Sequence, residues 1–145
     1  MMKSTNIVRF KILSLISAIS LAGCSEQLNV CVSGNFNSHL VFSIIENDER
    51  IPVVVHQLEI TAVVDASLKQ DFWVITGESL VNEIDYGVLP PGMKELTKSD
   101  KLNLASSYEI FVKLVRENEG RRIFAKEVFS FDKFGDVSVE NNKCP

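Results

Sequence analysis

The strongest constraint on the fold is a series of short apolar runs, rich in β-branched and aromatic residues and interrupted by turn residues. From residue 24 onward, no apolar pattern of period 3.6 continues for more than two helical turns, so long helices are not expected. Runs of this composition bounded by Gly, Pro, Asn or Asp indicate strands. The expected strands cover residues 30–32, 40–45, 53–55, 58–64, 72–75, 83–89, 108–115, 123–125 with 128–131, and 137–139.

The clearest hairpin lies at residues 108–131, with a polar turn between its strands. Ile110, Val112 and Leu114 share one face of its first strand, because side chains alternate along a strand. Phe111 and Val115 make the other face partly apolar, so this strand is expected inside a sheet. About seven to eight strands predict an all-β domain, an antiparallel β-sandwich of immunoglobulin- or fibronectin-like type. The predicted core includes Trp73, Ile75, Tyr86, Ile110, Val112, Leu114 and Phe129.

The first residues of the chain follow a different pattern. Lys3, Arg9 and Lys11 precede an apolar run at residues 12–22, which is interrupted only by serines and contains no acidic residue. A run of 11 residues is shorter than the ~20 that a membrane-spanning helix needs, so it is interpreted as part of a signal peptide. The run ends in Leu-Ala-Gly-Cys at residues 21–24. This order resembles the signal peptide and lipobox of bacterial lipoproteins; an uncleaved anchor with a chance cysteine is the alternative.

The lipobox resemblance implies cleavage before Cys24 and attachment of a diacylglycerol to its thiol. More than one acyl chain would make the membrane anchoring effectively permanent. Ser25, where an aspartate would favour the inner membrane, implies the periplasmic face of the outer membrane in a host that has one. The expected division of the chain is a signal peptide at residues 1–23, a lipidated tether at 24–29 and a β-sandwich domain at 30–145.

The net charge limits the classes of partner. The chain carries 15 Lys and Arg against 19 Asp and Glu, and removal of residues 1–23 changes its formal charge from −4 to −7. An acidic domain is a poor candidate for binding nucleic acid or for direct docking on anionic lipid. A basic protein partner would suit this charge, although many solvated periplasmic domains are equally acidic.

Two cysteines remain once Cys24 is assigned to lipid. Cys31 and Cys144 form an even pair in an oxidising compartment, which predicts a disulfide between the first strand and the end of the chain. Two free thiols are the alternative. A metal site is not expected, because His39 and His56 lie far from both cysteines and no ligand spacing of the zinc type occurs.

Outside the leader, the sequence contains no complete motif of known chemistry. The segment Gly77-Glu78-Ser79 lacks the second glycine of a nucleophile elbow, and the two histidines each lie in or beside an expected strand. No phosphate-binding glycine motif is present. Asp132 and Asp136 flank a glycine and are candidate calcium ligands, but a polar turn explains them better. The sequence therefore predicts no enzyme, no cofactor and no metal.

One segment is more specific than the rest. Residues 83–95 fit I-x-Y-G-x-x-P-x-G at Ile84, Tyr86, Gly87, Pro90 and Gly92, and residues 108–112 read Y-E-I-F-V. This pattern resembles small enterobacterial lipoproteins described as type VI secretion immunity lipoproteins, which protect against periplasmic phospholipase effectors. The specific similarity covers about a dozen residues and indicates a strand end and a turn, so no functional residue is carried over from that family.

The resemblance implies an immunity protein that binds and neutralises a phospholipase-type effector. The alternatives are a structural or assembly lipoprotein of an envelope machine and, less favoured, a small-ligand binder or enzyme. On a sandwich the contacts are expected from loops, and the 116–122 turn is the first candidate, followed by the 46–50 turn. The predicted partner-binding residues are Arg116, Glu117, Glu119, Arg121 and Arg122.

Overall fold

The computed structural model of the chain describes residues 28–65, 68–141 and 144–145. The predicted signal peptide, the lipidation site Cys24, Ser25 and most of the predicted tether lie outside the described residues. The strands are β1 (Asn29–Gly34), β2 (Leu40–Glu46), β3 (Glu49–Arg50), β4 (Val53–Val63), β5 (Lys69–Val81), β6 (Glu83–Asp85), β7 (Met93–Thr97), β8 (Tyr108–Arg116), β9 (Arg122–Phe131) and β10 (Val137–Val139).

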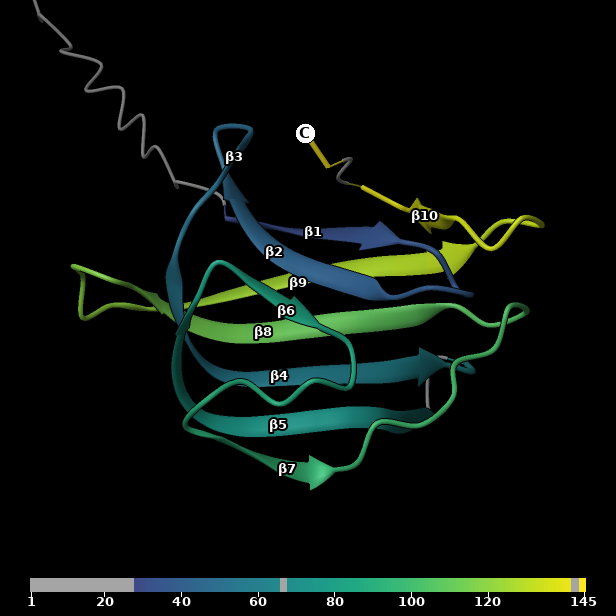
Figure 1. Ribbon diagram of the computed structural model, residues 1–145, viewed down its shortest axis with the longest axis horizontal. Helices are drawn as coiled ribbons and strands as arrows, with labels where there is room; N and C mark the ends of the chain where they lie inside the picture. The colour runs from purple at the N-terminus through teal and green to yellow at the C-terminus, as the bar shows by residue number, and fades with distance from the viewer. Residues whose placement is uncertain (1–27, 66–67, 142–143) are drawn as a thin grey trace, which may run out of the picture.

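These strands form two antiparallel sheets that pack face to face (Figure 1). The larger sheet has the order β10-β9-β8-β4-β5-β7. In the smaller sheet β2 pairs with β1 on one side, and with β3 and β6 on the other. The predicted all-β antiparallel sandwich is confirmed. The 108–131 hairpin is confirmed as β8 and β9, and β8 lies between β9 and β4 as its two partly apolar faces predicted.

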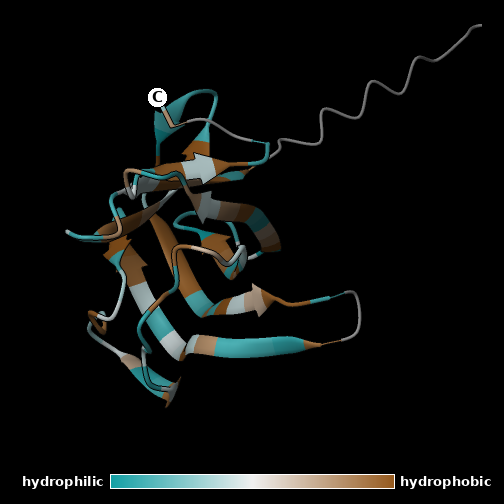
Figure 2. Ribbon diagram, turned by 90° about the vertical axis from the view of Figure 1, so that its right-hand side faces the viewer, coloured by the Kyte–Doolittle hydropathy of each residue, from teal (hydrophilic) through white to brown (hydrophobic). Residues whose placement is uncertain are grey.

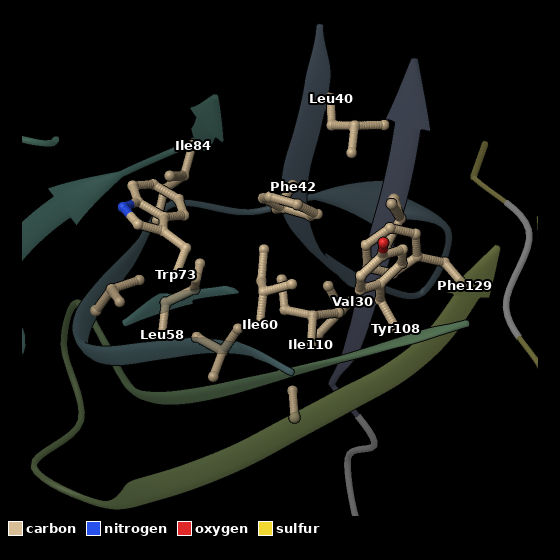
Figure 3. Close-up of a cluster of buried hydrophobic side chains, with 14 of the residues drawn as sticks. Val30, Leu40, Phe42, Leu58, Ile60, Trp73, Ile84, Tyr108, Ile110 and Phe129 are labelled. Atoms are coloured by element: carbon tan, nitrogen blue, oxygen red, sulfur yellow. The ribbon is translucent and has the colours of Figure 1, made fainter. Parts of the chain in front are cut away.

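The core lies between the two sheets and follows the alternation of each strand. Val30, Leu40, Phe42 and Ile84 of the smaller sheet face large apolar side chains of the larger sheet (Figure 3). Along β8, the inward-facing residues are at most 2% exposed, whereas the intervening ones are only half-buried. Six of the seven predicted core residues are buried, namely Trp73, Ile75, Ile110, Val112, Leu114 and Phe129.

The seventh predicted core residue, Tyr86, is only partly buried. Its ring packs against Trp73 and Phe42, with centroid distances of 5.4 and 6.5 Å. Its hydroxyl donates a hydrogen bond of 2.6 Å to the carbonyl oxygen of Asp100, so the side chain extends from the core to the rim of the sandwich. Burial raises the pKa of Tyr86 above its ordinary value.

The strand boundaries differ from the expected ones most clearly at four places, and the two-residue strand β3 was also not expected. The expected strands at 53–55 and 58–64 are one continuous strand, β4, with a bulge at His56. β5 extends beyond the expected 72–75 at both ends. Its polar first residues form the teal ribbon next to the short grey loop in Figure 2. β6 ends at Asp85 because the chain turns at Gly87, whose φ is +79°. β7 was not expected, since an edge strand with one buried residue has little apolar signal.

The fold begins slightly earlier than expected. Leu28 is buried against the core and β1 starts at Asn29, so the first packed residue lies inside the predicted 24–29 tether. Asn29 pairs with Ile45, near the tight turn between β2 and β3. In that turn Asn47 and Asp48 have φ values of +50° and +63°, as two-residue hairpin loops require. The chain therefore enters the domain at the end that carries the 46–50 turn.

The disulfide between Cys31 and Cys144 is confirmed. Its Cα atoms are 5.1 Å apart and the cysteines are 113 residues apart in the sequence. Cys31 points to the side of β1 opposite Val30 and Val32, because successive side chains of a strand alternate. The bond ties the end of the chain to the outer side of the smaller sheet, and this explains why Cys31 is fully buried on that side.

Candidate functional site

The 116–122 turn, the first predicted contact site, is joined to the 46–50 turn through Arg116. The guanidinium of Arg116 forms an ion pair with Glu46, and its second terminal nitrogen lies 3.5 Å from Oε1 of Glu119. The Arg116 side chain is only 14% exposed. Because Glu46 belongs to β2 and Arg116 to β8, this pair connects the two sheets at one end of the sandwich. Arg116 therefore holds the two candidate turns side by side and offers little surface to a partner.

The other predicted contact residues are arranged differently around this turn. Glu117 and Arg121 are exposed, and Glu119 is half-exposed while it contacts Arg116. Arg122 is the first residue of β9 and points to the outer face of the larger sheet, away from the core. The turn thus leads directly onto that outer face, which offers a broader surface than the turn itself.

Two of the strands on this outer face carry an alternation of aromatic and cationic residues. Phe111 of β8 lies opposite Lys126 of β9, and Lys113 lies opposite Phe124. The two phenyl rings stack diagonally, with centroids 5.5 Å apart and an interplanar angle of 23°. Phe124 nevertheless remains 60% exposed, so an apolar ring lies at the surface among cationic side chains. We call Phe111, Lys113, Arg122, Phe124 and Lys126 the aromatic–cationic face.

A hollow of about 410 Å³ adjoins the aromatic–cationic face on the same side of the sheet. It is lined by residues of five neighbouring strands and of the turn before β7, namely His56, Gln57, Thr76, Gly77, Gly92, Lys94, Lys113 and Arg122. Three of these side chains are cationic and none is acidic. Within the described part of the chain, Lys94, Lys113 and Arg122 form no ion pair.

Two glycines allow this hollow to exist. A Cβ on Gly77 would lie 2.3 Å from the carbonyl oxygen of Gly92, and a Cβ on Gly92 would lie 2.4 Å from that of Glu78. Both glycines have positive φ, of +148° and +83°. The close approach of β5 to the start of β7 therefore requires glycine at both positions, as the Pro-Pro-Gly turn at residues 90–92 predicted for Gly92.

Two acidic side chains of the outer face, Glu109 and Glu59, lie farther from the 116–122 turn and have partners within the chain. Glu109 accepts a hydrogen bond of 2.8 Å from the Lys69 ammonium, and this contact raises the pKa of Lys69. Glu59 accepts a hydrogen bond from the Gln57 amide. Positive charge near the turn is therefore available to an external ligand, whereas these carboxylates already have internal partners.

The other candidate chemistry has structural explanations. Asp132 accepts hydrogen bonds from the backbone nitrogens of Phe134 and Asp136, at 2.8 and 3.0 Å, so it stabilises a turn. Asp136 accepts one from the Asn35 amide at 2.7 Å. Among the residues that the structure describes, no group of three or more His, Cys, Asp or Glu is placed to hold a metal ion. His39 is exposed before β2, and His56 lies at the bulge of β4.

Comparison of the chain with family models, with curated proteins and with solved structures finds no match. No helix long and apolar enough to cross a membrane occurs in residues 28–65, 68–141 and 144–145.

The sequence pointed to the turn but not to the face beside it. The available signal was the alternation of residues 122–126, where Arg, Phe and Lys occupy every second position of a strand. This spacing places an aromatic side chain between two cationic ones on one face of the strand. The hollow carried no such signal, because its lining comes from five strands and Lys94 belongs to the unexpected strand β7.

Proposed function

We propose that this chain is a lipid-anchored immunity protein that binds a secreted phospholipase-type effector and neutralises it by covering its active site. The aromatic–cationic face is the proposed docking surface. The observation that carries this assignment is the exposed Phe124, stacked on Phe111 and set among cations on a regular sheet. Aromatic and arginine side chains at the centre of a protein interface commonly supply most of its binding energy.

The rigidity of this surface favours protein recognition. Phe111 projects from β8, which is paired with both β9 and β4. Phe124 projects from β9, which is paired with β8 at this point, whereas β10 covers only Phe129–Phe131. The stacked rings also restrict each other, which reduces the side-chain entropy that is lost on binding. A docking surface that is already ordered in the free protein suits a tight complex.

The proposed location rests on the leader. Lipidation of Cys24 would leave only residues 25–27 between the anchored cysteine and the buried Leu28, a reach of roughly 14 Å at ~3.4 Å per residue. The domain would sit close to the membrane, where a phospholipase acts. The similarity of residues 83–95 to type VI secretion immunity lipoproteins supports the choice of effector class.

The test expresses the full-length chain in a sensitive bacterial host together with a phospholipase-type effector directed to the periplasm, chosen first from the genes beside its own. We expect protection of the host and co-purification of the two proteins. Phe124→Ala should weaken the complex about thirtyfold, the effect of losing an interface anchor of ~2 kcal/mol, with little loss of stability because Phe124 is 60% exposed.

Phe134→Ala is the matched control. Phe134 is 68% exposed and also lies beside a lysine, with Lys133 Nζ 4.9 Å from its ring, but it occupies the turn at the opposite end of β9. This variant should bind and protect like the wild type. Co-purification without protection would replace the immunity function by an assembly role, and the absence of both would refute the proposal.

A further inference from the structure

The cationic hollow and its surroundings indicate the chemistry of the partner. We propose that the hollow receives the carboxylates of an acidic segment on a protein partner while the partner's apolar residues cover the Phe111–Phe124 pair. This inference rests on the proposed function for the identity of the partner, but it concerns the hollow, which has its own test. The cationic side chains that line the hollow indicate carboxylates as its ligands.

The hollow has the charge and the width for more than one carboxylate. Lys113 and Arg122 enter from β8 and β9 on one side, and Lys94 enters from β7 on the other. Five strands at ~4.8 Å spacing place the two sides about 19 Å apart, so several neighbouring acidic residues of one segment can be accommodated. The guanidinium of Arg122 is suited to bidentate pairing with a carboxylate.

The absence of internal competition strengthens this assignment. Within the residues that the structure describes, no ion pair uses Lys94, Lys113 or Arg122, and no acidic residue lines the hollow. Lys113 and Arg122, which lie on adjacent strands, repel each other in the free protein. An incoming anionic segment relieves this repulsion and gains three attractions, which fixes both its position and its orientation.

The charge of the whole chain distinguishes a protein segment from a polyanionic surface. The formal charge is −4 for the full sequence, so an extended anionic membrane or a nucleic acid is repelled by the rest of the molecule. A short acidic segment in the hollow interacts mainly with charges that lie within a Debye length of ~10 Å. Within this distance the charged side chains of the hollow are positive. The adjacent exposed Phe124 also suits an apolar protein contact rather than a phosphate.

The experiment measures binding of fluorescent poly-L-glutamate to the full-length chain in micelles of an uncharged detergent, at low and at high sodium chloride. We expect saturable binding that salt weakens. Lys113→Gln combined with Arg122→Gln should weaken it about tenfold, because two partly shielded ion pairs are lost. Lys101→Gln combined with Lys133→Gln removes the same charge from exposed positions at the opposite end of the domain and should leave binding unchanged.

Equal weakening by both double variants would mean a response to net charge alone and would overturn the proposal. Binding of phosphatidylglycerol-containing vesicles without binding of poly-L-glutamate would overturn it in favour of a lipid surface. The two proposals fail separately. An effector complex that depends on Phe124 but not on Lys113 and Arg122 would refute only the carboxylate site, whereas polyglutamate binding without any effector complex would refute only the immunity function.

Discussion

Replacement of Leu114 by alanine tests the facing of β8, on which both the core and the aromatic–cationic face depend. Leu114 is fully buried, between Val55 of β4 and Ile123 of β9 in the cross-strand register. The change removes the burial of three carbon atoms, about 2.4 kcal/mol at ~0.8 kcal/mol each. The cavity that remains between two packed sheets adds to this loss, so the free energy of unfolding should fall by ~3–5 kcal/mol.

The measurement is urea unfolding with the disulfide intact, followed by the fluorescence of Trp73, the single tryptophan of the chain, which is fully buried. Val115→Ala is the matched control, since Val115 is the next residue of the same strand but faces outward and is half-buried. It should cost at most ~1 kcal/mol. A loss below about 0.5 kcal/mol for Leu114→Ala, or a larger loss for Val115→Ala, would show that the facing of β8 is reversed.

Three further changes test other features of the chain. Replacing both Cys31 and Cys144 by serine should lower the free energy of unfolding by up to about 5 kcal/mol, because the bond closes a loop across 113 residues; the urea midpoint of the oxidised wild type is the reference, and an unchanged midpoint would contradict the estimate. Cys24→Ser should abolish incorporation of labelled palmitate in cells, and equal labelling of wild type and variant would exclude lipidation at this residue. Arg116→Met should cost ~1–3 kcal/mol because Glu46 loses its ion-pair partner at a partly buried position, and the additional change Glu46→Gln should recover part of that loss in the same urea assay; additive losses would show that the pair is not coupled.

The fold class was predictable because most long strands alternate in a simple way. In β8, Ile110, Val112 and Leu114 are separated by less apolar residues, and burial between two sheets follows directly from that pattern. β7 could not be found in this way, since Met93 is its only buried residue. The continuity of β4 was hidden by His56, because the bulge there shifts the alternation by one position.

The candidate site was less predictable because it depends on register and on distant pairs. The sequence marked Arg116 as a contact residue, but its ion pair joins it to Glu46, 70 residues earlier in the chain. The stacking of Phe111 on Phe124 needs the exact β8–β9 register, and the hollow needs Lys94 from an edge strand. Local patterns carry none of this information, because these contacts are set by tertiary packing.

The bond between Cys31 and Cys144 also determines what a protease can achieve. The two cysteines enclose almost the whole domain in one covalent ring, and the residues at 117–121 form an exposed turn inside that ring. Exposed turns of this kind are preferred sites of cleavage. A single cut there leaves both fragments joined through sulfur, with β8 and β9 still held by their neighbours in the sheet. Release of a fragment therefore requires a second cut or a reductant, which suits a protein predicted to work outside the cytoplasm.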